Sequence, residues 1–183
     1  MILAIDTSAA QCAVALADPS GVVLARRAEP MRRGHAERLM PMIEAVLAEA
    51  GTARDRLARV AVCTGPGSFT GVRVGVAAAR GIALGLGIPA VGINRFDALA
   101  AAAKARGPVA VALAGPRGQV YLALAGAAGE GAPRLLAAGA LEAALPAGVP
   151  CIGDAAPGAV PEDGLADPAA IAALAARAAT GSP

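Results

Sequence analysis

The first part of the chain has an apolar and polar pattern that predicts strands before helices. Residues 2–8, ILAIDTS, begin with a run of apolar residues and end with polar ones, which is typical of a buried strand. Residues 12–27 predict two more strands around a turn at residues 18–21, where Asp, Pro, Ser and Gly follow one another. Three consecutive strands with such short connections favour an antiparallel start.

Helical periodicity begins after residue 34. Leu39, Ile43 and Val46 recur at the spacing of one helical face, and Gly51 ends the pattern. The pattern then predicts, in order, a strand, a helix, a strand and a helix at residues 59–65, 68–87, 89–94 and 95–107. Because such alternation is typical of parallel crossovers, we expect residues 1–107 to form one α/β subdomain.

The last part of the chain resembles a shortened version of the strand-rich start. Residues 107–126 predict two strands around a Gly-Pro-Arg-Gly turn, followed by a short strand near Leu135. A helix near 139–146, a strand at 149–154 and a last helix capped by Asp167 complete the pattern. We therefore expect a second subdomain at residues 108–183.

Composition restricts the core and the environment. Hydrophobic residues make up 56% and aromatic residues 2%, so alanine, valine, leucine and isoleucine must build the core. A net charge of +2 is too small to indicate a dedicated nucleic-acid binder. Cys12, Cys63 and Cys151 are too far apart in sequence to indicate a zinc site or a disulfide framework. The start lacks a signal peptide's basic region, and no apolar run reaches the about 20 residues of a membrane span, so we expect a cytoplasmic protein.

The segment TGPGSFTGVRVGVAAARG at residues 64–81 carries the most distinctive pattern. It lacks the lysine of a Walker A loop, and its glycines are spaced one residue too widely for a dinucleotide fingerprint. It predicts either a tight strand-to-helix turn capped by Ser68 or Thr70, or a turn that holds an anion on free backbone N–H groups. We favour the first interpretation. The second gives these candidate nucleotide or phosphate contacts: Asp6, Thr7, Ser8, Gly65, Gly67 and Ser68.

Glycines recur at four-residue spacing within the helix that follows. Gly71 and Gly75 form one such pair, and Gly81 and Gly85 another. Each glycine destabilises a helix by about 1 kcal/mol relative to alanine, so a close contact should offset the loss. The contact is either with the protein's own sheet or with a docked partner, and both can apply on different faces. We expect these residues at a partner interface: Leu39, Ile43, Val46, Leu47, Gly71, Val72, Gly75, Val76 and Ala79.

Polar side chains for catalysis are few. Arginines surround the single histidine, His35, and we expect a solvated basic loop there, with RNA contact by Arg32 and Arg33 as the alternative. There is no HExxH or GxSxG motif and no supported Cys-His pair. We therefore assign no catalytic residue, no metal ligand and no cofactor.

Four segments together closely resemble the TsaB (YeaZ) family, which is glycoprotease-like. They are ILAIDTS, HAERLMPMIEAVL, TGPGSFTGVRVGVAAARGIALGLGIPAVGI and GPRGQVY, and they lie in about the first two thirds of the chain. The resemblance implies the α/β fold of the actin, Hsp70 and sugar-kinase (ASKHA) superfamily, with two subdomains that each begin as a three-stranded meander. It also implies a role in biosynthesis of threonylcarbamoyladenosine in bacterial tRNA.

In that family the implied role is a non-catalytic scaffold that docks the catalytic subunit TsaD through its first two helices. The ATPase TsaE and tRNA are the further implied partners, and a homodimer is expected in the absence of TsaD. The stretch from Asn94 to Leu99 corresponds to the TsaD His-x-x-x-His motif but has no histidine. Ala114, Pro116 and Gln119 also depart from the family pattern. The alternative is a stand-alone nucleotide hydrolase or glycoprotease-like metallopeptidase.

Overall fold

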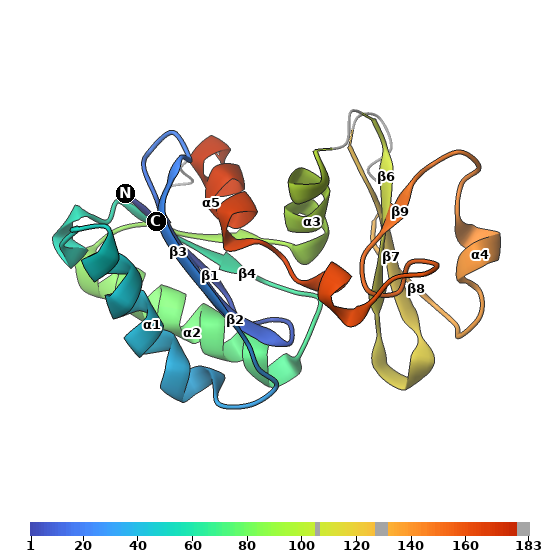
Figure 1. Ribbon diagram of the computed structural model, residues 1–183, viewed down its shortest axis with the longest axis horizontal. Helices are drawn as coiled ribbons and strands as arrows, with labels where there is room; N and C mark the ends of the chain where they lie inside the picture. The colour runs from blue at the N-terminus through green and yellow to red at the C-terminus, as the bar shows by residue number, and fades with distance from the viewer. Residues whose placement is uncertain (105–106, 127–131, 179–183) are drawn as a thin grey trace. The chain divides into compact units, whose positions relative to one another are not determined.

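A computed structural model describes residues 1–104, 107–126 and 132–178 (Figure 1). The chain divides into two compact units. The first contains Met1–Arg95 and the segment that begins at Ala166, and the second is Phe96–Leu165. This division differs from the expected boundary between residues 107 and 108, because one helix joins the second unit and the last helix returns to the first.

The first unit is built on a five-stranded mixed sheet. Its strands are β1 (Ile2–Asp6), β2 (Gln11–Ala17), β3 (Val23–Pro30), β4 (Arg59–Cys63) and β5 (Ala90–Ile93). Their order in the sheet is β3-β2-β1-β4-β5, with β1 to β3 antiparallel and β4 and β5 parallel to β1. The predicted antiparallel start and the parallel crossovers are therefore confirmed.

Side-chain size differs between the two faces of this sheet. Leu3, Ile5 and Val14 belong to a core cluster with α1 (His35–Glu49) and α2 (Phe69–Leu86). The alternate positions, such as Ala4 and Ala15, point to the opposite face because side chains alternate along a strand. Figure 1 shows α1 and α2 on one face and α5 (Pro168–Arg177) on the other.

The alanine-lined face allows α5 to lie close to the sheet. Ile171 on α5 is fully buried, and the Arg59 guanidinium donates to the carbonyl oxygen of Ala175. At the start of the same segment, Gln11 Nε2 donates to the carbonyl oxygen of Ala166 at 2.8 Å. The predicted Asp167 cap is confirmed, since its carboxylate accepts from the backbone N–H of Ala169. Helix α5 is thus part of the first unit, and our assignment of it to the second subdomain was wrong.

The second unit has a four-stranded sheet of order β8-β7-β6-β9. Its strands are β6 (Val109–Ala114), β7 (Val120–Ala125), β8 (Arg134–Leu136) and β9 (Cys151–Ile152), and only β9 is parallel to its neighbour. Helix α3 (Arg95–Ala103) covers one face through Phe96 and Leu99, and α4 (Leu141–Ala144) packs at the other face through Leu141. Over the residues that the structure describes, the two units also contain three short 3-10 helices, which are η1 (Arg54–Arg56), η2 (Pro116–Gly118) and η3 (Pro161–Gly164).

The sheet of each unit begins with the expected three-stranded antiparallel meander, β1-β2-β3 and β6-β7-β8. The expected α/β class, with two sheets that each start as a three-stranded meander, is therefore confirmed.

Helix α2 is long and apolar. Its 18 residues have the length and composition of a membrane span, and it is the one such helix in the described ranges. A helix that covers the sheet of a globular domain has the same character. Gly71, Gly75, Ala79 and Ala83 on α2 are buried, which is how this helix packs against its own unit.

Candidate functional site

The carboxyl end of β1 carries a buried polar cluster. Asp6, Thr7 and Ser8 are each 1% exposed or less. The Asp6 carboxylate accepts hydrogen bonds from the backbone N–H and the hydroxyl of Ser8, at 2.8 and 2.6 Å, and from Gln11 Nε2 at 3.1 Å. Because a buried carboxylate is costly without partners, these bonds explain how Asp6 is tolerated in the core.

The turn between β4 and α2 is attached to this cluster. The Ser68 N–H donates to the Ser8 carbonyl at 2.7 Å, and Ser68 Oγ accepts from the Gly71 N–H at 3.2 Å. A side chain at Gly67 would overlap the same Ser8 carbonyl. The expected tight turn with a Ser68 cap is therefore confirmed.

The six candidate nucleotide contacts are thus brought together in space. Gly67 and Ser68 are exposed, whereas Gly65 is buried together with the three residues that end β1. The hydrogen bonds of Asp6 and Ser8 are made within the chain. Nucleotide or phosphate contact by this set stays a prediction.

Most of the residues expected at a partner interface lie in the protein's own core. Val72 and Val76 are half-buried, and the other seven are buried. These side chains pack mainly within the first unit, and docking of a partner on this set stays a prediction. Gly75 shows this packing, since a Cβ there would lie 2.6 Å from Thr7 Oγ1 and 3.3 Å from Val62. The buried residues of the set are Leu39, Ile43, Val46, Leu47, Gly71, Gly75 and Ala79.

The outer faces of α1 and α2 carry a different apolar surface. Met40 is 43% exposed on α1, and Phe69 and Leu84 are 70% and 86% exposed on α2. A groove of about 220 Å³ runs between the two helices, and Gly81 and Gly85 are among its lining residues. The four-residue spacing of these two glycines was the sequence signal for this surface. We call the groove, together with Met40, Leu84 and Leu86, the α1/α2 groove.

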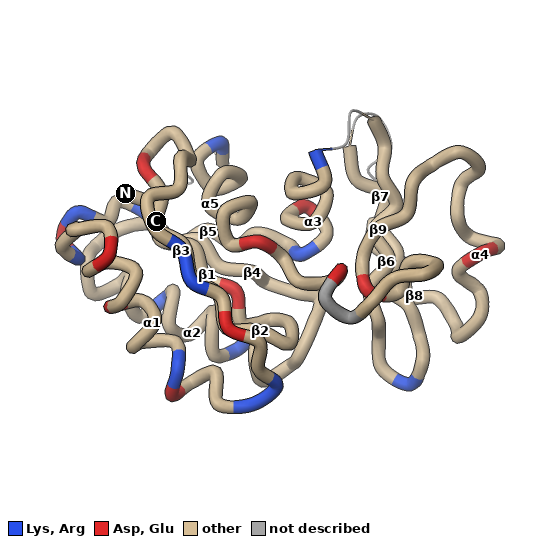
Figure 2. Tube along the Cα trace, viewed as in Figure 1, with Lys and Arg blue, Asp and Glu red and all other residues tan. Residues whose placement is uncertain are grey.

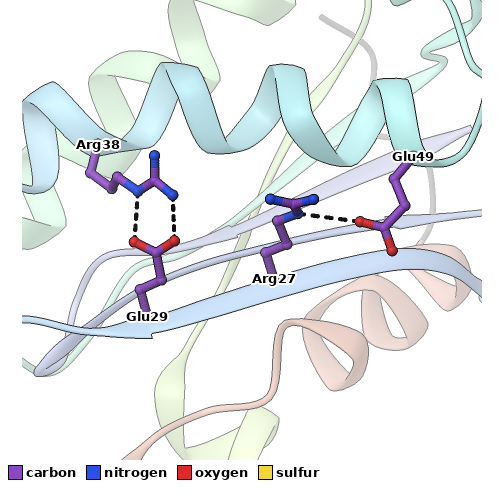
Figure 3. A network of polar contacts seen from close by, with 4 residues as sticks. All are labelled: Arg27, Glu29, Arg38 and Glu49. Carbon is purple, nitrogen blue, oxygen red and sulfur yellow. Dashed lines mark hydrogen bonds and ion pairs between the residues drawn. The ribbon is translucent and has the colours of Figure 1, made fainter.

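Two ion pairs fasten α1 to β3 (Figure 3). Arg38 forms a bidentate pair with Glu29, and Arg27 Nε lies 3.2 Å from Glu49 Oε2. The hydrogen bonds from Arg38 lower the pKa of Glu29 and raise that of Arg38. Figure 2 shows a basic segment in the connection between β3 and α1, where Arg32 and Arg33 are exposed.

The cysteines behave as small core residues. Cys12 and Cys63 are buried, Cys151 is half-buried, and all three thiols are free. Burial raises the pKa of Cys12 to about 11 and that of Cys63 to about 12. Over the described ranges, no three His, Cys, Asp or Glu side chains are grouped as a metal site would require.

Comparison with known proteins assigns the family. The family model described as "TsaD: tRNA N6-adenosine threonylcarbamoyltransferase" matches residues 20–139, more than half of the chain. The chain is similar to the tRNA threonylcarbamoyladenosine biosynthesis protein TsaB of Escherichia coli, with 41% identity over 54% of this chain and 42% of that protein. TsaB of Haemophilus influenzae is 40% identical over 56% of this chain and 42% of its own length.

A solved structure named YeaZ from Pseudomonas aeruginosa is also similar. It has 34% identity and a TM-score of 0.67, over 74% of this chain and 66% of that one. The chain spans less than half the length of the two curated relatives. From the family model and these similarities together, the chain belongs to the TsaD family, in which it is similar to the TsaB (YeaZ) proteins.

Proposed function

We propose that the chain is a non-catalytic scaffold subunit in the biosynthesis of threonylcarbamoyladenosine in tRNA, and that it docks the catalytic subunit TsaD. The names of its relatives support a role in threonylcarbamoyladenosine biosynthesis. The hydrogen bonds of Asp6 and Ser8 at the end of β1 support the scaffold role. Both residues bond to other groups of the first unit, so they stabilise the fold. TsaE and tRNA would join through the complex, and homodimers would form without TsaD.

The observation that carries the docking proposal is the exposed apolar α1/α2 groove. Large exposed apolar side chains gathered on one face mark interaction sites more often than scattered ones do. Gly81 and Gly85 would have open space around a Cβ, so a partner backbone can approach α2 closely there. Met40, which lines the groove, and Leu84, which is exposed on α2, would supply the apolar contact area.

Introducing a negative charge on this surface tests the proposal. Met40→Glu and Leu84→Glu should each reduce co-purification of TsaD at least tenfold, because a carboxylate would be buried in the interface. Leu135→Glu is the matched control, since Leu135 is 48% exposed on β8 of the other unit. Circular dichroism should show that all three variants keep the native melting temperature within a few degrees.

Two results would contradict the proposal. Wild-type recovery of TsaD by both groove variants would reject this surface as the docking site. ATP hydrolysis or peptide cleavage by the purified chain alone would reject the scaffold role and support the enzyme alternative. Variants of Ile43 or Gly75 are unsuitable here, because both residues are buried and their replacement would disturb folding.

A further inference from the structure

A second pocket lies where the N-terminal ends of α1 and α2 meet. Its volume is about 360 Å³, and it is lined by residues of the β3–α1 connection, the first turn of α1 and the first turns of α2. None of its lining residues lines the α1/α2 groove. The two surfaces are therefore separate features of the first unit.

The start of α1 leaves backbone donors at this pocket. Gly34, the residue before the helix, has a left-handed conformation (φ 85°) and no side chain to cap the first turn. The N–H groups of a first helical turn have no partner within the helix, and they carry partial positive charge. At α2, the Ser68 side chain accepts from the N–H of Gly71. The pocket therefore has the electrostatic character of a site for an anion.

His35 gives an independent indication of a ligand. His35 is one of the residues that line the pocket, and it is 8% exposed. Its Nε2 atom is buried and has no hydrogen-bond partner among the described residues. Buried polar atoms in native proteins are nearly always paired. An acceptor from outside the chain would complete the hydrogen bonding of this imidazole in the tautomer that carries the N–H on Nε2.

The charged side chains around the pocket favour the same ligand. Arg32 and Arg33 are exposed and line it, and the one acidic residue that lines it is Glu37. Arginine recognises phosphate oxygens through several N–H donors at once. We propose that this pocket binds a phosphate group, held by Arg32, Arg33, His35 and the first turn of α1. This proposal does not depend on the docking of TsaD.

The single histidine makes the proposal directly measurable. The full chain has one imidazole, so its ring proton signals in an NMR spectrum need no assignment by mutation. Titration with inorganic phosphate at constant pH and ionic strength should shift the His35 signals saturably, with a dissociation constant in the millimolar range or tighter. Chloride at the same ionic strength should leave the signals unchanged.

Variants separate a built site from a general charge effect. The double variant Arg32→Ala/Arg33→Ala should weaken phosphate binding at least tenfold, and Glu37→Gln should strengthen it by removing the opposing charge. Arg80→Ala is the matched control, because Arg80 is exposed on α2 away from the pocket lining and its loss should leave binding unchanged. For His35→Asn, melting temperature with and without phosphate replaces the lost signal, and the stabilisation by phosphate should disappear.

The phosphate can come from a small molecule or from a nucleic acid, and competition distinguishes these sources. If tRNA displaces inorganic phosphate from the His35 signals, the bound group is a nucleic-acid phosphate. If phosphate binds and tRNA does not compete, the ligand is a small phosphate. An absence of any saturable shift, or equal weakening by Arg80→Ala and the double arginine variant, would overturn the proposal.

Discussion

Thr7 Oγ1 donates a hydrogen bond of 2.7 Å to the backbone carbonyl of Gly71, which joins the end of β1 to the first turn of α2. The same approach leaves no room for a side chain at Gly71, because a Cβ there would overlap the Thr7 carbonyl. Two segments that are 64 residues apart in sequence thus have their backbones in direct contact. This contact explains why α2 has glycine at residues 71 and 75, both of which lie against Thr7.

Gly71→Ala should therefore destabilise the protein although alanine is the better helix former. We expect a loss of roughly 1–3 kcal/mol, the usual effect of overpacking. Gly81→Ala is the matched control, because a Cβ at Gly81 meets no atom within 4 Å. It should stabilise α2 by up to about 1 kcal/mol. Urea unfolding measures both, and equal effects of the two variants would contradict the packing of α2.

Helix α5 should be required for the stability of the first unit. Ile171→Asp places a carboxylate in a fully buried position and should cost several kcal/mol, or prevent folding, because the charge has no partner there. Leu174→Asp is the control, since Leu174 on the same helix is only half-buried and should cost less. Amide hydrogen exchange should show lost protection in β1 and β2 of the Ile171 variant. Loss confined to residues 108–165 would instead assign α5 to the second subdomain, as the sequence pattern predicts.

The cysteines should differ in reactivity. Cys12 and Cys63 are buried and their pKa values are raised to about 11 and about 12, so little thiolate forms at pH 8. Cys151 is half-buried, and burial also raises its pKa. We expect slow modification of Cys151 alone in the native protein and of all three thiols in denaturant, as measured with a chromogenic disulfide reagent. Fast native labelling of Cys63 would show that β4 is not covered as described.

Stability should fall in acid partly through Glu29. Its pKa is lowered in the folded protein by Arg38, so its contribution is present above the unfolded value of about 4.3 and is lost as pH falls through the lower, folded value. Glu29→Gln should therefore reduce the melting temperature modestly at pH 7, and this reduction should shrink progressively as the pH falls below about 4.3. In an Arg38→Met background the effect of Glu29→Gln should be smaller, because only the charge of Arg27 then favours the carboxylate. A difference that persists at low pH would contradict this role of the ion pair.

The local pattern of the chain determined much of the fold. Apolar runs bounded by Gly, Pro and Asp gave the strands, and the helical spacing of Leu39, Ile43 and Val46 gave α1, because these signals depend on neighbours in sequence. The helix caps at Ser68 and Asp167 were likewise predicted from neighbouring residues in sequence. The TsaB-like segments predicted the family, which the comparisons confirm.

Only the tertiary structure decided which faces are buried. Gly71 and Gly81 look alike in sequence, yet the first lies against Thr7 and the second lines an open groove, because α2 can turn only one face to the sheet. Similarly, α5 follows the second unit along the chain but packs on the alanine face of the first, through Ile171 and the bond from Gln11 to Ala166. Periodicity identifies an apolar stripe, whereas the partner of that stripe depends on contacts between residues far apart in the chain.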